Sequence, residues 1–445
     1  MKISVVGTGY VGLVSGVCFA EVGHDVICVD NDYTKVNKIN NGESPIYEEG
    51  LSELLKKHIN INLRATTDLS KAILNTELTI IAVGTPFGKD TIDLQYIEKV
   101  SKEIGQVLKN KPSYHVVVVK STVVPGTTDE LVLPLLEKYS CKKAGKDFGV
   151  GMNPEFLREG SAITDFMSPD RIVIGGIDKK TQNKLNDIYK PFSETDKLKT
   201  NNKTAEMIKY TSNSLLATLI SFSNEIGNLC SLQGDMDAIE VMKGVHLDKR
   251  ISPILKNNQR ISPSIISYLE AGCGFGGSCF PKDVRALISY GKNAGDKMQL
   301  LSSVVDINND QPMKMLSLLT KHFPNLDGKR IAILGLAFKP GTDDMRESPA
   351  IPIIKYLLSK NTKIKAYDPV AQDEAKKIFN TTKITYCESI RESTRDVDAV
   401  LLLTRWQEFE TLPKILNKYI NPPLLIDGRR MFPKNCLPRY EGIGI

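Results

Sequence analysis

A glycine loop between two short apolar runs does most to restrict the fold of this chain. Residues 2–6 form a strand-like apolar run, and the glycine loop 7–12 (GTGYVG) follows it directly. A helical pattern then extends to Val22, and a second strand-like run ends in Asp30. Strand, glycine loop, helix, strand and acid in this order predict a βαβ unit that binds a dinucleotide. The pyrophosphate is expected at the helix N-terminus, and Asp30 favours NAD over NADP because an acid there binds the ribose hydroxyls.

Strand-like and helix-like segments continue to alternate through the first half of the chain. Strand-like runs at 78–83, 115–119 and 148–152 each end in a polar turn. Ligands of open parallel sheets bind at the carboxyl ends of the strands, so these turns are candidate walls of a site. Turn chemistry and helix capping would also explain their polar residues, and we favour that role for Thr85 by itself. The candidates are Thr85, Thr122, Glu155 and Glu159.

A long helix is expected near the middle of the chain. Residues 204–232 contain almost no Gly or Pro and have a helical period. Lys209 and Asn213 would share one face of this helix, where a surface lysine beside an amide is the simpler interpretation. The helical pattern resumes at 281–321, with a break at 291–295. Because so long a helix must bury its apolar stripe, a homodimer is expected.

A second α/β unit begins at Gly328. It repeats the order of the N-terminus: a strand-like run at 329–334, a turn, a helical segment at 351–358, and a strand-like run at 363–367 followed by Asp368. The GxGxxG pattern is missing here, and the turn offers Lys339 and Arg346, which suit phosphate. The predicted fold class is therefore α/β, with two Rossmann-like doubly wound domains joined by a long central helix and a helical region.

The segment 274–283 (GFGGSCFPKD) contains a candidate nucleophile, Cys279. Its glycines let the backbone approach a ligand closely, and Pro281 is well placed to begin a helix. Cys279 would then lie near a helix N-terminus, where the dipole and a nearby cation lower the pKa of a thiol. Packing is the alternative, since cysteine is among the most often buried residue types, and from Cys279 alone it is the better interpretation.

Composition excludes several function classes. The chain has 445 residues, which is long enough for two or three domains. Its 58 Lys and Arg residues are spread along the sequence among 52 Asp and Glu residues, which leaves a net charge of +6. Nucleic acid is therefore not indicated, whereas small anionic ligands are compatible. Eight irregularly spaced cysteines, with no CxxC pair or Cys/His cluster, favour reduced thiols in the cytoplasm and no metal site. No signal peptide is expected, because the sequence enters a strand-like run at once. Polar residues interrupt the most apolar stretch, 215–232, so no membrane span is expected.

These motifs resemble those of the UDP-glucose/GDP-mannose dehydrogenase family, in the family's order and over nearly the whole chain. The most specific are 153–160 (NPEFLREG) and the cysteine segment 274–283. The segment 165–171 (DFMSPDR) resembles the UDP-glucose branch more than the GDP-mannose or UDP-N-acetylmannosamine branches. The other matching segments are the glycine loop, 121–122, 209–213 and 338–349. The resemblance implies an NAD-binding domain at 1–200, a central helical and dimerisation domain with the cysteine at 201–322, and a UDP-sugar-binding domain at 323–445.

The resemblance implies a four-electron oxidation of UDP-glucose at C6 to UDP-glucuronate, with two NAD reduced in turn. Cys279 would trap the aldehyde as a thiohemiacetal, which is oxidised to a thioester and hydrolysed. None of the five histidines lies in a motif. The resemblance implies Lys209, or a water bound to Asp283, as the base. Lys209 and Asn213 would hold the oxyanion. The residues implied to position or deprotonate the hydrolytic water are Asp283, Glu155 and, through a bound water, Thr122.

Binding roles are implied by the same resemblance, position by position. Contacts with NAD are implied for Gly7, Gly9, Tyr10, Val11, Gly12, Asp30, Lys35, Thr85, Thr122, Glu159 and Arg346. Contacts with the UDP-sugar are implied for Glu155, Phe156, Leu157, Arg158, Lys209, Asn213, Tyr268, Gly276, Lys339 and Arg429.

One feature departs from the family pattern. The family has an arginine upstream of the cysteine segment that reaches the partner subunit's substrate. Arg250 and Arg260 both stand in a similar setting, with an expanded spacing to Cys279, so the assignment stays open.

Three competing hypotheses for the function also remain. They are a dehydrogenase for UDP-N-acetylhexosamine or GDP-mannose, a two-electron hydroxyacid dehydrogenase, and a catalytically silent NAD-sensing or scaffold protein.

Overall fold

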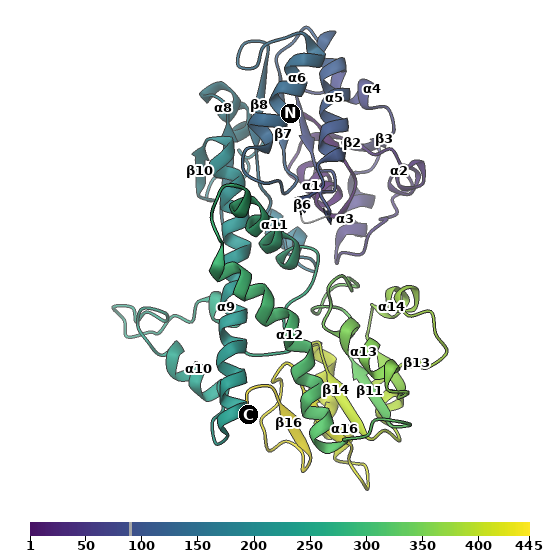
Figure 1. Ribbon diagram of the computed structural model, residues 1–445. Coiled ribbons are helices and arrows are strands. Elements are labelled where there is room, and N and C mark those ends of the chain that lie inside the picture. The colour runs from purple at the N-terminus through teal and green to yellow at the C-terminus, as the bar shows by residue number, and fades with distance from the viewer. Residues whose placement is uncertain (89–90) are drawn as a thin grey trace. The chain divides into compact units, whose positions relative to one another are not determined.

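The computed structural model describes residues 1–88 and 91–445 (Figure 1). The chain forms two compact units, Met1–Ser212 (unit 1) and Asn213–Ile445 (unit 2). Helix α9, Asn202–Gln233, runs across the division, and each unit is described by itself. Among the described residues, no helix combines the length and apolar character that crossing a bilayer requires.

Unit 1 contains an eight-stranded sheet with the strand order β10-β9-β8-β7-β4-β1-β2-β3. From β3 to β8 this is the order of a doubly wound dinucleotide-binding sheet, which reverses between β1 and β4, where ligands bind in such folds. The strands are β1 Lys2–Val6, β2 Asp25–Val29, β3 Leu63–Thr66, β4 Leu78–Ile81, β7 His115–Val119, β8 Phe148–Met152, β9 Ile172–Gly176 and β10 Lys197–Thr200; β5 Phe87–Gly88 and β6 Thr91–Ile92 form a separate antiparallel pair.

The core of unit 1 lies on both faces of the sheet. Alternate residues of β7 point to opposite faces, so Val116 packs in the layer with α1 and Val117 in the layer with α5 and α6. Nearly all of α1 is buried, which fits its position as the crossover helix of the first βαβ unit. The helices are α1 Tyr10–Glu21, α2 Tyr33–Asn40, α3 Leu51–His58, α4 Leu69–Leu74, α5 Gln95–Lys109, the π-helical turn η1 Thr128–Val132, α6 Leu133–Ser140, α7 Ala162–Met167 and α8 Lys179–Asp187.

One pair of strands departs from the parallel sheet that the alternation predicts. β9 runs antiparallel to β8, whereas all other neighbours in this sheet are parallel. The connecting segment 153–171 therefore begins and ends at the carboxyl edge of β8 and makes no full crossover. The segment 153–160 thus lies at the edge where doubly wound sheets bind ligands.

Unit 2 contains a six-stranded parallel sheet with the order β13-β12-β11-β14-β15-β16, again that of a doubly wound domain. The strands are β11 Arg330–Leu334, β12 Lys363–Tyr367, β13 Ile384–Tyr386, β14 Ala399–Leu402, β15 Leu424–Asp427 and β16 Tyr440–Gly442. The helices are α10 Ala238–His246, η2 Ser264–Tyr268, α11 Phe280–Asn293, α12 Gln299–His322, α13 Ala350–Ser359, α14 Gln372–Ile378, α15 Ile390–Thr394, η3 Gln407–Thr411 and α16 Leu412–Leu416.

A buried ion pair fastens α10 to the sheet of unit 2. Asp237 caps the N-terminus of α10 and pairs with the guanidinium of Arg430, which follows β15, at 2.9 Å. The last residues of the chain add to this contact, because Ala238 N donates to the carbonyl oxygen of Gly444. Burial opposes ionisation of Asp237, but the hydrogen bond from Arg430 outweighs it and holds the pKa of the carboxyl below its ordinary value.

The predicted fold class is confirmed, and most predicted segments coincide with observed elements. β1, β7, β8 and β12 have the predicted bounds, and α9 is longer than predicted by two residues at its start and one at its end. A break at 294–298 separates α11 from α12, three residues later than the expected break at 291–295. Short helices such as α3 and α7 are not predicted, since six to eight residues are too few for a clear helical period.

Candidate active site

The glycine loop begins directly after β1 and leads into α1. Gly7 has a φ of 97°, and a Cβ there would lie 2.7 Å from the carbonyl oxygen of Ala82. A Cβ at Gly12 would collide with the carbonyl oxygen of Gly7. A Cβ at Gly9, the N-cap of α1, would meet nothing within 4 Å. The loop therefore leaves open space beside the helix N-terminus, which fits the approach of a dinucleotide pyrophosphate.

Asp30 ends β2 and is bonded to the glycine loop. Its carboxylate accepts hydrogen bonds from the backbone N–H of Thr8 at 2.8 Å and from the Thr8 hydroxyl at 2.6 Å. Burial would raise the pKa of Asp30, but these bonds, one from Asp32 N–H and the charge of Lys35 hold it below its ordinary value. Asp30 is thus an ionised acceptor beside the loop, as the NAD fingerprint requires. Lys35 lies in the first turn of α2.

Glu48 is a site residue that the motifs do not reveal. It is buried and accepts hydrogen bonds from the Tyr10 hydroxyl and from the N–H groups of Gly160 and Ala162, the latter two at 2.7 Å. Burial and then the bond to Glu48 raise the pKa of Tyr10 well above its ordinary range. Glu48 therefore joins the first residue of α1 to the start of α7. No signal in the sequence marks it, because its partners are far along the chain.

The turns after β4 and β7 are bonded to each other. The Thr85 hydroxyl donates to the carbonyl oxygen of Thr122 at 2.7 Å, and the Ser121 hydroxyl donates to that of Val83, also at 2.7 Å. For Thr85 this is the turn-bonding role favoured from the sequence. These bonds fix the backbone on the β4 side of the point where the strand order reverses.

A buried ion pair lies at the carboxyl edge of β8. Lys209 Nζ, on α9, is 2.9 Å from Glu155 Oε1, and both side chains are almost wholly buried. The second oxygen of Glu155 accepts the backbone N–H of Leu157 at 2.7 Å. Burial alone would raise the pKa of Glu155, but the charge and hydrogen bond of Lys209, the Leu157 N–H and the charge of Lys120 hold it below its ordinary value.

Lys120 adds a second buried cation near Glu155. It ends β7 and donates to Asn153 Oδ1 at 2.9 Å, and the Tyr189 hydroxyl donates to the same oxygen at 2.5 Å. Burial lowers the pKa of Lys120 to about 8, against the attraction of Glu155. Sequence reasoning places neither Lys120 nor Tyr189 in the site.

The rest of the segment 153–160 is more exposed. The Arg171 guanidinium lies 3.9 Å from the ring centre of Phe156, and Lys209 Nζ lies 5.5 Å from it. Arg158 pairs with Asp165 at 2.5 Å, and the Arg158 side chain is exposed. Leu157 and Glu159 are half-buried.

In unit 2, Cys279 is the N-cap of α11, as predicted, and Pro281 lies in the first turn. Its sulfur is 3.6 Å from the Ser278 hydroxyl, and its carbonyl oxygen accepts the backbone N–H of Asp283. The Asp283 side chain is almost wholly buried, pairs with Lys282 at 2.5 Å, and accepts from Asn213 Nδ2 at 2.6 Å. Asn213 and Asp283 are thus in contact one helical turn from the cysteine.

The residues predicted to bind the UDP-sugar in unit 2 surround the cysteine segment. Arg429 donates to the carbonyl oxygens of Gly274 at 3.0 Å and Leu403 at 2.7 Å. A Cβ at Gly276 would collide with the carbonyl oxygen of Glu347, so the turn after β11 lies against the glycine run. Among the remaining UDP-sugar positions, Lys339 Nζ lies 5.7 Å from the Phe338 ring, and Tyr268 lies 6.3 Å from the Phe280 ring. Arg346, which is predicted to contact NAD, pairs with Asp344 at 2.8 Å.

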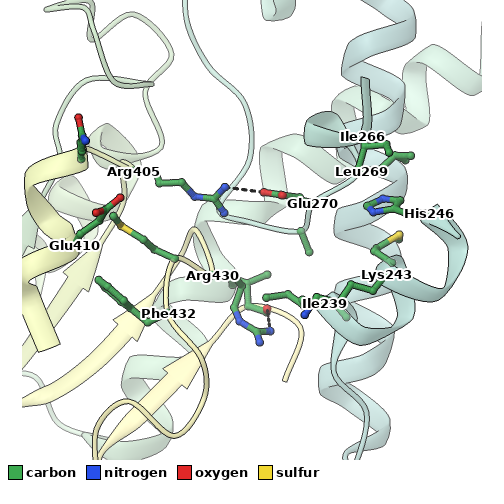
Figure 2. Close-up of a pocket in the computed structure, with 16 residues that line it drawn as sticks. Ile239, Lys243, His246, Ile266, Leu269, Glu270, Arg405, Glu410, Arg430 and Phe432 are labelled. Atoms are coloured by element: carbon green, nitrogen blue, oxygen red, sulfur yellow. Dashed lines mark hydrogen bonds and ion pairs between the residues drawn. The ribbon is translucent and has the colours of Figure 1, made fainter. Parts of the chain in front are cut away.

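A cavity of about 760 Å³ lies elsewhere in unit 2 (Figure 2). It is lined by α10, the turn after η2 and the segments after β14 and β15, and it contains none of the predicted catalytic residues. Arg405 and Glu270 form an ion pair at 2.8 Å in its wall, as Figure 2 shows. In the described chain, no group of three or more His, Cys, Asp or Glu side chains could hold a metal ion.

The predicted site residues therefore fall into two groups, each within one unit. Unit 1 contains the glycine loop with Asp30, Thr85 with Thr122, and Glu155 with Lys209. Unit 2 contains Cys279, Asn213 with Asp283, and the arginine and lysine turns. Lys209 and Asn213 are one turn apart on α9, and both are buried, so the surface-lysine interpretation is wrong.

Comparison with known proteins places the chain in a family. The family models for the UDP-glucose/GDP-mannose dehydrogenase family match residues 1–193 (NAD binding domain), 203–310 (central domain) and 332–434 (UDP binding domain). A UDP-glucose 6-dehydrogenase of Haloferax volcanii is 41% identical over 448 residues, which cover 100% of both chains.

Two further similarities bear on the fold and the substrate. The structure of a UDP-glucose dehydrogenase from the hyperthermophilic archaeon Pyrobaculum islandicum has a TM-score of 0.89 at 37% identity and covers 99% of this chain and 97% of that one. A GDP-mannose 6-dehydrogenase of Pseudomonas savastanoi pv. phaseolicola is 41% identical over 423 residues, 93% of each chain. The chain therefore belongs to the UDP-glucose/GDP-mannose dehydrogenase family and is an oxidoreductase that uses NAD.

Proposed function

We propose that this enzyme oxidises the C6 hydroxyl of UDP-glucose to a carboxylate, forming UDP-glucuronate and two NADH. The observation that carries the proposal is the group formed by Cys279, Asn213 and Asp283 at the start of α11. A two-electron hydroxyacid dehydrogenase needs no thiol nucleophile, whereas oxidation of an aldehyde to an acid does. A UDP binding domain and relatives named UDP-glucose 6-dehydrogenase support the sugar nucleotide.

The reaction divides into two oxidations and a hydrolysis. NAD, held by the glycine loop and Asp30, would supply the hydride acceptor for each oxidation. Lys209, or a water held by Asp283, takes the proton of the C6 hydroxyl. The Cys279 thiolate adds to the resulting aldehyde, and its C–S bond converts the carbonyl oxygen into the alkoxide of a thiohemiacetal. Loss of the second hydride gives a thioester, which water cleaves to the carboxylate and the free thiol.

Buried polar groups suit the charges that form in these steps. Lys209 carries an N–H donor within a low-dielectric environment, where such a donor stabilises a developing oxyanion most strongly. Asn213 Nδ2 is already bonded to Asp283 and orients it. Glu155, held ionised beside Lys209, is suited to position the hydrolytic water, with Thr122 as a further partner. The eight free thiols suit a reducing, cytoplasmic compartment.

We also propose that two copies pair through α9. Leu215, Phe222 and Leu229 are each about half exposed and lie seven residues apart, with Leu219 and Ile226 between them. Apolar residues at alternating spacings of four and three form the seam of paired helices. Exposing so many large apolar side chains on one helix face to water is unfavourable, and a second copy with the same stripe would cover it.

Of the two candidate arginines, Arg250 is better suited to reach a partner subunit. Arg260 donates to the carbonyl oxygens of Leu247 and Ser252, both at 2.9 Å, and so braces its own loop. The Arg250 guanidinium pairs with the nearby Asp248 at 2.5 Å, and its side chain is 89% exposed. A surface pair of this kind is weak and easily exchanged for a ligand phosphate.

A panel of nucleotide sugars tests the proposed reaction. With UDP-glucose the enzyme should release two NADH per sugar, measured by absorbance against a known amount of substrate. UDP-N-acetylglucosamine, UDP-N-acetylmannosamine and GDP-mannose are tested separately as alternative substrates. Activity on one of these without activity on UDP-glucose would refute the substrate, and one NADH per sugar would favour a two-electron dehydrogenase. Binding of both ligands without NADH would favour the scaffold hypothesis.

Substitution of the nucleophile tests the covalent route. Cys279→Ser should slow acid formation by about three orders of magnitude or more, since removing a nucleophile abolishes the steps that follow it. NAD affinity, measured by calorimetry, should change little. Cys141→Ser, at an exposed thiol in unit 1, is the matched control and should keep full activity. Full turnover by Cys279→Ser would rule out covalent catalysis.

The α9 stripe predicts the oligomeric state. Light scattering at micromolar concentration should give the mass of a dimer. Phe222→Glu, which places a charge in the stripe, should give monomers, because a buried unpaired carboxylate opposes association. Lys314→Glu reverses an exposed charge on α12 and should leave the dimer intact. A monomeric wild-type protein would contradict the proposed pairing.

Mixing two inactive variants tests whether Arg250 acts across the dimer. Cys279→Ser and Arg250→Ala should each have low activity, but their mixed dimers contain one site with both native residues. Co-expression of the two should therefore restore up to about half of the wild-type activity per mixed dimer, by the closed symmetry of dimers. Arg260→Ala in place of Arg250→Ala is the control. The assignment fails if only the Arg260 variant complements Cys279→Ser.

A further inference from the structure

The first turns of α9 hold a loop that no motif explains. The buried carboxylate of Glu206 accepts three hydrogen bonds from this loop: Gly126 N–H at 2.6 Å, Thr128 N–H at 2.8 Å and the Thr128 hydroxyl at 2.6 Å. The loop follows Ser121 and Thr122 at the carboxyl end of β7. Glu206 therefore fastens α9 to the chain segment that carries Thr122.

Two neighbouring contacts strengthen this attachment. Asn202 donates to Asp129 at 2.7 Å, and Lys203 pairs with Glu130 at 2.7 Å. Asp129 and Glu130 belong to η1, a π-helical turn, and π-helical turns occur often at functional sites. The Glu206 carboxylate accepts N–H groups at the start of this turn, where an anion is favoured.

The same helix then reaches the buried ion pair. Lys209 follows Glu206 by three residues, so the two lie on neighbouring positions of one helix face. Lys209 contacts Glu155 at 2.9 Å. One rigid stretch of α9 thus connects the loop after β7 with the segment after β8.

We propose that Glu206 is a positioning residue, which fixes the loop that carries Thr122 in register with Lys209 and Glu155 through its three hydrogen bonds. The inference rests on the proposed function, because the proposed function is what assigns catalytic roles to Thr122, Lys209 and Glu155. We do not propose that Glu206 contacts the reacting atoms. It acts by holding the polar groups of unit 1 at fixed distances, and a misplacement of 1 Å in such groups lowers rates by about 100-fold.

The ionisation state of Glu206 decides how many of these bonds it can accept. An ionised carboxylate accepts all three, whereas a protonated one turns an acceptor into a donor that faces an N–H group. Asp129 on η1 is a charged neighbour of Glu206, with Glu130 beside it on the same turn, and Lys203 and Lys209 lie three residues before and after Glu206 on α9. Burial, aided by Asp129 and opposed by the bonds from Thr128 and Gly126, raises the pKa of Glu206 to about 7.

Stability and activity then respond to pH in opposite directions. Because the pKa is raised on folding, the stability that Glu206 contributes is present in acid and is lost as the pH rises from its ordinary pKa to about 7. The positioning bonds form as Glu206 ionises in the folded protein, around pH 7. A merely structural role would move stability and activity together.

The experiment compares the full-length wild-type enzyme with Glu206→Gln, which resembles the protonated acid at every pH. At pH 8, kcat per active site should be lower in the variant by about tenfold or more. At pH 6 the two kcat values should converge, since neither the protonated carboxyl nor the amide can accept all three hydrogen bonds. The thermal midpoint of the variant should instead rise relative to that of wild type between pH 6 and pH 8, because wild type loses stability over this range and the neutral amide does not. Lys190→Ala, which removes an exposed ion pair with Asp187 elsewhere in unit 1, should stay within about twofold of wild type.

Three results would overturn the proposal. A ratio of wild-type to Glu206→Gln kcat that is independent of pH would show a structural role only. If Glu206→Gln does not fold, Thr128→Ala replaces it; loss of one donor should move the acid limb of the kcat profile to higher pH, and an unmoved limb would refute the proposal. A wild-type enzyme without turnover on any nucleotide sugar would refute the proposed function and, with it, the positioning role. The first two results refute the positioning role alone, so the two kinds of failure can be told apart.

Discussion

The ion pair between Glu155 and Lys209 is the interaction on which the arrangement of unit 1 depends. Both groups are buried, so each would be strongly destabilised without the other. Breaking such a pair by removing one partner typically costs about 3–5 kcal/mol. The pair therefore fixes α9 against the segment after β8 and keeps an acid ionised at the edge of the sheet. Lys120 adds positive charge from β7, and with Asn153 and Tyr189 it completes a buried polar network.

Helix α9 organises polar groups along much of its length. In unit 1 its first turns contact the loop after β7 through Glu206 and the segment after β8 through Lys209. In unit 2 Asn213 is bonded to Asp283, on the helix that begins at Cys279. A helix provides such a series at low entropic cost, because its backbone is already fixed and each side chain needs only to be oriented.

The two doubly wound sheets use the same strand order for different purposes. In the first, Asp30 holds the glycine loop through Thr8 and open space remains beside Gly9. In the second, Asp368 occupies the corresponding place after β12, but it accepts N–H groups from Leu336, Ala337 and the Trp406 indole, which consume its acceptor capacity within the fold. This difference agrees with the match of the first domain to NAD binding and of the second to UDP binding.

The sequence by itself determined the fold class, the bounds of β1, β7, β8 and β12, and the position of Cys279 at a helix start, because these follow from local patterns of apolar residues, glycine and proline. It also marked Lys209 and Asn213, but as surface residues when judged from periodicity. Only the tertiary structure buried them, paired Lys209 with Glu155, and turned β9 against β8. Glu48 and Glu206 carry no local signal, since their partners lie far along the chain and their burial depends on how helices pack on the sheet.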